Sequence, residues 1–164
     1  MHHGTSLSAL AFGEDESTID GTLESKINYK MGQEDGAWVR YYENGLLKER
    51  GTKKDGKTDG PFISYYENGQ LDYKFTLKDS KKHGHYVHGW PNGQLLEETT
   101  YKDDIQVDGP YVKYHQNGQV SAEGLIKDGK YEGLSLAYYE DGQIWIKRIH
   151  NGGSTDVTAI FPRC

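Results

Sequence analysis

The stretch GAWVRYYENGLL, which begins at Gly36, decides the fold of this chain because close copies of it return four more times. The copies are GPFISYYENGQL from Gly60, GHYVHGWPNGQL from Gly84, GPYVKYHQNGQV from Gly109 and GLSLAYYEDGQI from Gly133. Their starting points are 24, 24, 25 and 24 residues apart. A constant period of this length is typical of a solenoid, in which each repeat packs only on its neighbours.

Every copy contains the strongest short-range indication of a β-hairpin, an Asn-Gly or Asp-Gly dipeptide between β-prone runs. We therefore predict a two-residue type I′ turn at each dipeptide, which would pair Arg40 with Glu49 and Trp38 with Gly51 and fix the same register in the other copies. The dipeptides are Asn44-Gly45, Asn68-Gly69, Asn92-Gly93, Asn117-Gly118 and Asp141-Gly142.

The segments between the copies also read as turns. Lys54-Asp55-Gly56-Lys57 and Lys127-Asp128-Gly129-Lys130 are clear turns, and the equivalents near Asp79 and Asp103 are degenerate. The sequence thus predicts an all-β fold: a single-layer antiparallel meander of about five β-hairpin repeats with a period of 24 residues.

Alternation along the strands assigns side chains to two faces of the predicted sheet. One face should stack aromatic and aliphatic columns, which would replace the core that a single layer cannot bury between two layers. We call it the ring face. Its predicted columns are Trp38, Phe62, Tyr86 and Tyr111; Tyr42, Tyr66, Trp90, His115 and Tyr139; and Leu47, Leu71, Leu95, Val120 and Ile144.

The opposite face, which we call the tyrosine face, carries tyrosines beside an aliphatic column and a charged column. Rigid tyrosine rings with a rim of charge resemble the composition of binding surfaces. The alternative is that these tyrosines only stabilise the sheet by cross-strand stacking. The candidate partner-binding residues are Tyr41, Tyr65, Tyr114, Tyr138, Trp145, Glu98 and Glu123.

Composition limits the class of partner. The 164 residues suffice for one domain, and the net charge of −6 disfavours nucleic acid or an anionic membrane surface as the main partner and favours a basic protein. The single Cys164 cannot form an internal disulfide. No apolar run approaches the length needed to span a bilayer.

Residues 1–21 are predicted to lie outside the repeat domain, as a disordered tail, a cloning scar or the remnant of a signal peptide. The motif Ala9-Leu10-Ala11 fits a signal-peptidase site, which would place the mature protein in the periplasm; the alternative is the cytoplasm. Residues 22–164 are predicted to form the repeat domain, capped by a lone strand from Thr22 to Met31 and by a closing hairpin of Ile144 to His150 with Thr155 to Phe161.

Residues suited to catalysis or metal binding are few, and their arrangement is poor. Ser135, in GLSLA, loosely resembles a nucleophile elbow, but that motif needs a strand-to-helix turn and Ser135 lies within a predicted strand. His83 and His85 should point to one side of their strand and His88 to the other, which is unsuited to sharing a metal ion. We therefore predict a protein that is not an enzyme and that has no catalytic residues, metal or cofactor.

The phrase YYENGQL followed by a KDGK turn resembles the bacterial variant of the MORN repeat, over roughly residues 22–150. Many proteins with this variant are classed as antitoxin or immunity proteins that bind a toxin encoded beside them, and some accompany effectors such as periplasmic lipases. The resemblance implies a monomeric immunity protein that blocks a secreted toxin sterically, a type VI secretion lipase being one candidate. The third copy departs from the pattern with Gly89-Trp90-Pro91.

Eukaryotic MORN proteins suggest an alternative function, a scaffold that attaches to membrane lipid or to a cell-envelope polymer. Basic clusters exist around Lys53, Lys54 and Lys57 and around Lys78, Lys81 and Lys82. Both lie in predicted loops, where solvated charge is the simpler interpretation, and the acidic balance of the chain argues against the lipid alternative.

Overall fold

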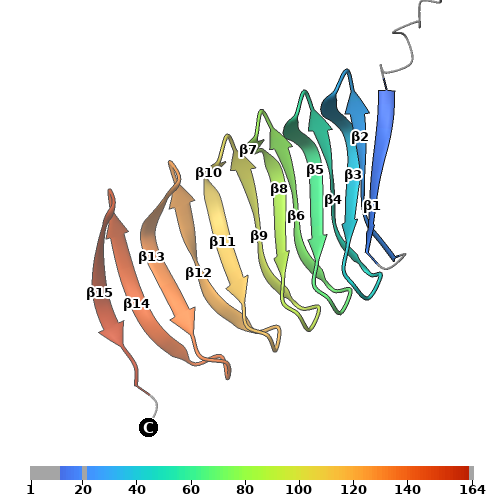
Figure 1. The fold of residues 1–164 in the computed structure, drawn as a ribbon. Helices are drawn as coiled ribbons and strands as arrows, with labels where there is room; N and C mark the ends of the chain where they lie inside the picture. Colours follow the sequence, from blue (N-terminus) through green and yellow to red (C-terminus); the bar gives the residue numbers. More distant parts are fainter. Residues whose placement is uncertain (1–11, 20–21, 163–164) are drawn as a thin grey trace, which may run out of the picture.

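The chain folds as one open, twisted antiparallel sheet, described by a computed structural model for residues 12–19 and 22–162 (Figure 1). The strands follow one another in chain order across the sheet, and no crossover occurs within these ranges. The described residues contain no helix, and therefore none that could cross a membrane. The predicted all-β, single-layer meander is confirmed.

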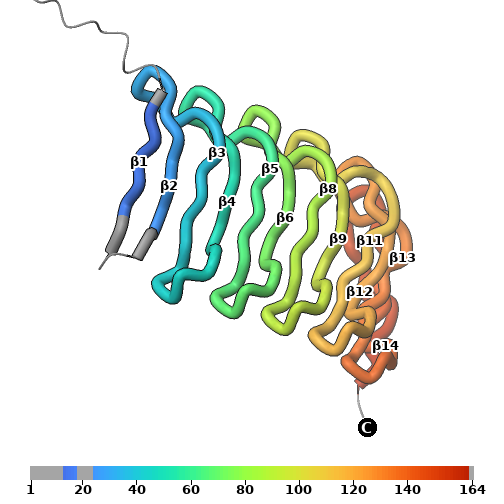
Figure 2. The backbone as a smooth tube through the Cα atoms, turned by 90° about the vertical axis from the view of Figure 1, so that its right-hand side faces the viewer, coloured from blue at the N-terminus to red at the C-terminus, as the bar shows by residue number. Residues whose placement is uncertain are grey.

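The N-terminal half of the sheet consists of β1 (Phe12–Ile19), β2 (Thr22–Lys30), β3 (Gln33–Tyr41), β4 (Leu47–Lys54), β5 (Lys57–Tyr65), β6 (Leu71–Lys78) and β7 (Lys81–Lys82). The C-terminal half consists of β8 (Gly84–Gly89), β9 (Leu95–Lys102), β10 (Ile105–Gln106), β11 (Gly109–Tyr114), β12 (Val120–Lys127), β13 (Lys130–Tyr138), β14 (Ile144–Asn151) and β15 (Ser154–Ile160). Figure 2 shows the hairpins stacked side by side along the ribbon.

The predicted strand register is correct in the body of the hairpins. Arg40 pairs with Glu49 and Trp38 pairs with Gly51. Phe62 pairs with Phe75 at the equivalent place of the next repeat. The repeats therefore share one register, which brings equivalent side chains into columns across the sheet.

The predicted type I′ turn at the Asn-Gly dipeptides is wrong. The N–H of Gly45 donates to the carbonyl of Tyr42, and the N–H of Tyr42 donates to the carbonyl of Leu46, both at 2.8 Å. Gly45 has a φ of 79°, whereas Asn44 is not among the residues with positive φ. This geometry is a three-residue loop, a type I turn followed by a left-handed glycine. We call the edge formed by these five loops the loop edge; it lies at the bottom of Figure 1.

A bulge in the strand after each loop restores the register. In the first repeat Tyr41, rather than Tyr42, pairs with Leu47, and the register shifts between Arg40 and Tyr41. Cross-strand partners share a face, so the predicted column that begins with Leu47 lies on the tyrosine face and its assignment to the ring face is wrong. Lys48 is the extra residue of the bulge, and its Nζ lies 5.4 Å from the ring centre of Tyr42.

Type I′ turns occur at the opposite edge, which we call the turn edge. Asp55 and Gly56 have φ values of 50° and 77°, and the flanking Lys54 and Lys57 pair directly. Positive φ at both central residues defines this turn type. The same pattern holds at Met31-Gly32, Asp79-Ser80, Asp103-Asp104, Asp128-Gly129 and Gly152-Gly153.

The sheet begins earlier than the sequence indicated, because part of the predicted tail is a strand. β1 pairs with β2, so the predicted first strand is not a lone cap. Lys26 makes ion pairs with this acidic segment: its Nζ lies 2.8 Å from Glu14 and 3.3 Å from Glu16. Residues 1–11, including the Ala9-Leu10-Ala11 motif, lie outside the described residues. The predicted closing hairpin exists as β14 and β15.

The buried side chains lie on the ring face. Rings form a continuous row from Trp38 to Phe62 (6.0 Å between centres), from Phe62 to Phe75 (4.8 Å) and from Phe75 to Tyr86 (6.0 Å). A Cβ at Gly51 would lie 2.9 Å from the ring of Trp38, so this glycine makes room for the indole. The buried apolar residues of the described chain are Trp38, Tyr86, Tyr111, Ile126, Ala137 and Ile146.

Candidate functional site

Asparagines at the loop edge connect each repeat to the next. The Nδ2 group of Asn68 donates to the carbonyl of Pro91 at 2.6 Å, while its Oδ1 accepts the N–H of Gln70 at 3.0 Å. One side chain thus shapes its own loop and holds the following loop. Asn44, Asn92 and Asn117 make the same two bonds with their own loops and with Glu67, Gln116 and Glu140.

A second ladder runs beside the first through the residue that precedes each loop. The hydroxyl of Tyr42 donates to the carbonyl of Tyr65 at 2.7 Å, and the hydroxyl of Tyr66 donates to the carbonyl of Gly89 at 2.9 Å. The third and fourth repeats make the same bond with other side chains, Trp90 Nε1 to Tyr114 and His115 Nε2 to Tyr138, and the fifth again uses a tyrosine, Tyr139 to Phe161. The two ladders fix the relative positions of neighbouring repeats, so both faces are presented by a preorganised sheet.

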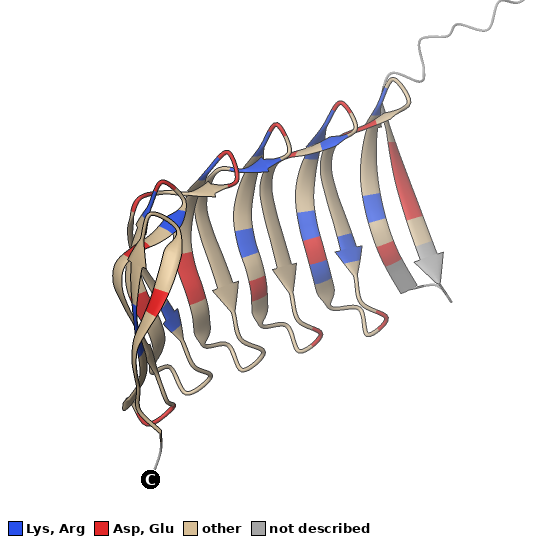
Figure 3. Cartoon of the chain, turned by 90° about the vertical axis from the view of Figure 1, so that its left-hand side faces the viewer, with Lys and Arg blue, Asp and Glu red and all other residues tan. Residues whose placement is uncertain are grey.

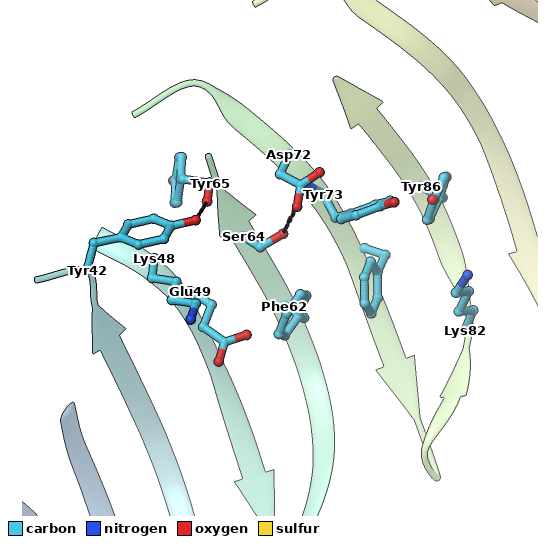
Figure 4. A pocket seen from close by; sticks show the side chains of 11 residues that line it. Tyr42, Lys48, Glu49, Phe62, Ser64, Tyr65, Asp72, Tyr73, Lys82 and Tyr86 are labelled. Carbon is cyan, nitrogen blue, oxygen red and sulfur yellow. Dashed lines mark hydrogen bonds between the residues drawn. The ribbon is translucent and has the colours of Figure 1, made fainter. Parts of the chain in front are cut away.

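The ring face contains a hollow of about 470 Å³ across the second repeat and its neighbours (Figure 4). Its lining combines aromatic rings with groups of both charges, among them Tyr42, Phe62, Asp72, Tyr73, Lys82 and Tyr86. Phe62, Tyr73 and Tyr86 point toward it from three adjacent strands in the close view. Concave, mostly apolar surfaces with a few polar groups are typical of ligand sites.

Lys82 places a cation inside this aromatic surface. Its Nζ lies 4.8 Å from the ring centre of Tyr86, 5.1 Å from that of Tyr101 and 5.8 Å from that of Phe75. Contacts of this geometry are attractive because the face of an aromatic ring is electron-rich. Lys82 was predicted to lie in a loop with its charge in solvent, and this prediction is wrong.

Asp72 organises the polar groups of the hollow. Its carboxylate accepts the hydroxyl of Ser64 at 3.3 Å and lies 3.8 Å from Nε2 of His88. Burial, followed by a hydrogen bond with Asp72, raises the pKa of Tyr66 to about 12. Burial lowers the pKa of His88, whose ring stacks on Tyr73 at 4.1 Å.

Four of the predicted partner-binding residues share one column of the tyrosine face. Tyr41, Tyr65 and Tyr138 pair with the aliphatic residue after their loop, as does Tyr114, and all four are half-buried. The hydroxyl of Tyr138 donates to the carboxylate of Glu123; this bond, followed by burial, raises the pKa of Tyr138 to about 12.

The other predicted partner-binding residues are less uniform. Glu98 lies on the tyrosine face, where its Oε1 is 2.6 Å from Nε2 of His85. Trp145 does not join the tyrosine column. It occupies the bulge after the fifth loop, and its ring centre lies 6.3 Å from that of Tyr139, as Lys48 lies beside Tyr42. This bulge turns Trp145 toward the ring face.

The histidines of the third repeat have separate partners. His83 Nδ1 lies 3.6 Å from Asp103, Nε2 of His85 lies 2.6 Å from Glu98, and Nε2 of His88 lies 3.8 Å from Asp72. Among the described residues, no group of three or more His, Cys, Asp or Glu side chains is arranged to hold a metal ion.

Ser135 makes a buried hydrogen bond in the last repeat. Its Oγ lies 2.8 Å from Nε2 of His150, and Nδ1 of the same imidazole lies 2.9 Å from the Oγ1 of Thr155. Ser135 and His150 are 5% and 6% exposed. Ser135 occupies the ring-face position where earlier repeats have Trp38 or Phe62. Its bond with His150 satisfies the hydrogen-bonding groups of two buried polar side chains.

The four turns between consecutive repeats at the turn edge carry both charges. Lys54 and Lys57 flank Asp55, and Lys127 and Lys130 flank Asp128. Figure 3 shows the acidic residues at the tips of the turns with basic residues beside them. The predicted basic clusters therefore lie beside carboxylates, which reduces their attraction for an anionic surface.

The comparison with protein families identifies five copies of one repeat. The model described as the MORN repeat variant matches residues 34–53, 58–79, 82–103, 107–128 and 131–150. No curated protein matches the chain. The five matches include one hairpin each and together cover more than half of the sequence. This chain therefore belongs to the MORN repeat variant family.

Proposed function

We propose that this protein is an immunity protein that binds a secreted toxin and blocks it sterically. The observation that carries the proposal is the preorganised sheet: two hydrogen-bond ladders hold the repeats, and half-buried tyrosines are presented in a column. A rigid surface with tyrosine anchors loses little entropy on binding a protein. The expected contact residues are Tyr41, Tyr65, Tyr114, Tyr138, Trp145, Glu98 and Glu123.

Electrostatics favours a basic partner. The chain has a net charge of −6, and opposite charge speeds association and disfavours wrong partners. A type VI secretion effector with lipase activity is one candidate toxin, in which case the immunity protein would act in the periplasm as a monomer. Cell fractionation distinguishes the periplasm from the cytoplasm, and light scattering of the purified protein measures its oligomeric state.

The test is co-purification with the product of the adjacent gene and rescue of cells that express that product. We expect a stable complex and restored growth. The quadruple variant Y41A/Y65A/Y114A/Y138A, checked for folding by circular dichroism, should lose both. Failure of the wild-type protein to bind the neighbouring gene product at micromolar concentration would contradict the proposal.

A second candidate function is a scaffold that binds membrane lipid or a cell-envelope polymer. The ring-face hollow favours it, because aromatic rings and lysines line a concave surface. Flotation with anionic liposomes separates the two functions. Binding that weakens with added salt would support the scaffold, and indifference to lipid would leave the immunity proposal as the better account.

A further inference from the structure

Four exposed apolar side chains lie on the tyrosine face of the last two repeats as two cross-strand pairs, which are diagonal neighbours because Leu134 lies two residues after Glu132, the partner of Leu125. Pro110 pairs with Leu125 across β11 and β12, and Leu134 pairs with Ile149 across β13 and β14. Leu125, Leu134 and Ile149 are 44%, 54% and 38% exposed. We call these four residues the apolar patch. Contiguous exposed apolar groups of this kind mark interaction surfaces more often than isolated ones do.

The first three repeats show that folding does not require this patch. Thr52, Thr76 and Thr100 stand where the last two repeats have Leu125 and Ile149. Their cross-strand partners are Ala37, Pro61 and His85. The strand register at these positions is the same, so a threonine fits the sheet equally well. The aliphatic side chains of the last two repeats therefore need a reason other than the stability of the sheet.

Carboxylates lie immediately beside the patch. Glu132 is the cross-strand partner of Leu125, and Asp156 is the partner of Ile149. A third carboxylate, that of Glu123, lies two residues before Leu125 on the same face. An apolar centre with an acidic rim is complementary to an apolar side chain surrounded by basic groups.

The lysines of this face do not cancel that acidic rim. Lys127 and Lys130 flank Asp128, whose backbone N–H donates to the carboxylate of Asp108 at 2.7 Å, so two carboxylates stand beside these two lysines at the turn edge. Lys147 extends over the ring of Phe161, with its Nζ 5.6 Å from the ring centre. A second copy of the chain would bring the same carboxylates against each other, which disfavours self-association through the patch.

We propose that the apolar patch is the centre of the partner-binding surface and takes an apolar side chain flanked by lysine or arginine on the bound protein. This inference rests on the proposed function, because it names the part of the sheet that the toxin covers. Within the tyrosine column it favours Tyr114 and Tyr138 as contacts, because they belong to the two repeats that carry the patch, whereas Tyr41 and Tyr65 belong to repeats that lack it.

The double variant L125T/I149T tests the inference, with T76A/T100A as the matched control in the same column of the earlier repeats. The probe is the purified product of the adjacent gene, and the measurement is its affinity by calorimetry. We expect L125T/I149T to weaken binding by about thirtyfold or more, as loss of a central anchor does, and T76A/T100A to change it by less than about threefold. Both variants should keep the melting temperature of the wild type within a few degrees, because these side chains are exposed.

The outcomes separate the two proposals. If the wild-type protein binds the probe and L125T/I149T binds equally well, the patch is not the contact and this inference is overturned, while the immunity function stands. If the wild type does not bind the probe at all, the proposed function fails and this inference fails with it. A wild-type dimer that becomes monomeric in L125T/I149T would show that a second copy covers the patch, which also overturns the inference.

Discussion

The loop edge and the turn edge of the sheet both contain Asn-Gly or Asp-Gly dipeptides, but they connect neighbouring repeats differently. At the loop edge every repeat forms the same three-residue loop, and each asparagine or tyrosine rung bonds to the next repeat. At the turn edge the two-residue turns accept Asp-Gly, Asp-Ser, Asp-Asp and Met-Gly. The sequence is therefore most uniform at the edge whose side chains bond to the next repeat, and the turn type alone does not require that uniformity.

The turn edge has a less regular connection between repeats. The side chains of Asp35 and Asp59 accept the N–H of Asp55 and Asp79 at 3.3 and 3.2 Å, and Asp108 does the same for Asp128. The third repeat has His83 at this position, and there the bond runs in the other direction, from the N–H of Lys82 to Asp104. The loop edge therefore connects the repeats through the same bonds throughout, whereas the turn edge tolerates variation in its residues and bonds.

The largest effect is expected from Asn68→Ala at the loop edge, which removes the bond to Pro91 and the bond within the loop. Two hydrogen bonds at about 1 kcal/mol each should lower the free energy of unfolding by about 2 kcal/mol. Asn68→Asp is the matched control. An aspartate keeps the acceptor for the N–H of Gln70 and lacks the amide donor, as the natural Asp141 does. It should therefore lower the free energy of unfolding by about half as much as the alanine. Equal losses of stability in the two variants would contradict the bond between repeats. Urea denaturation measures both.

Tyr66→Phe removes the single hydrogen bond from the Tyr66 hydroxyl to the carbonyl of Gly89 and should lower the free energy of unfolding by about 1 kcal/mol. The pKa of Tyr66 is about 12 in the folded protein, against 10.0 for an ordinary tyrosine, so the folded state holds the proton more tightly. Its contribution is therefore complete below pH 10 and is lost as the pH rises toward 12.

The phenylalanine variant should show a shallower loss of stability between pH 10 and 12 than the wild type. Urea denaturation at a series of pH values measures the difference, and the other tyrosines, common to both proteins, serve as the internal reference. Identical slopes would mean that Tyr66 titrates like a tyrosine in water.

Asp59→Ala tests the turn edge and should have a smaller effect than either loop-edge variant. Its carboxylate accepts one N–H, that of Asp79, at 3.2 Å. A single bond at an exposed turn should contribute about 0.5 kcal/mol to the free energy of unfolding. A loss as large as that of Asn68→Ala would mean that the two edges hold the repeats equally.

The smallest effect is expected from His83→Asp, which gives the third repeat the residue found at Asp35, Asp59 and Asp108. The new carboxylate can accept the N–H of Asp103, and we expect a gain of a few tenths of a kcal/mol. Thermal melting against the wild type measures it. A clear loss of stability would show that the contact between His83 and Asp103 contributes more than the regular bond.

Much of the fold could be predicted from the sequence because the register follows from one loop per repeat. The pairing of Trp38 with Gly51 is correct, yet the loop type is wrong, since Asn-Gly suits both a type I′ turn and a type I turn with a left-handed glycine. Pro91 was the indication that could have distinguished them. It stands in the place of Glu43, and proline is favoured at the second position of a type I turn.

The candidate site was less predictable because it depends on the bulges and on contacts between repeats. One extra residue per hairpin moved Leu47 to the tyrosine face and turned Trp145 toward the ring face. No local pattern could show that Lys82 would lie over three rings, all of them on other strands of the sheet. Likewise, no local pattern in β1 shows that its carboxylates would meet Lys26 of the following strand.

The most direct test of the account is the solvent exchange of the side-chain amides of Asn44, Asn68, Asn92 and Asn117, measured by nuclear magnetic resonance. If these amides join consecutive repeats, one proton of each should exchange much more slowly than in a free asparagine. Asn151, which lies at the turn edge and outside this ladder, should serve as the reference. Fast exchange at all four ladder positions would contradict the claim that the loop edge locks the hairpins into one preorganised ribbon.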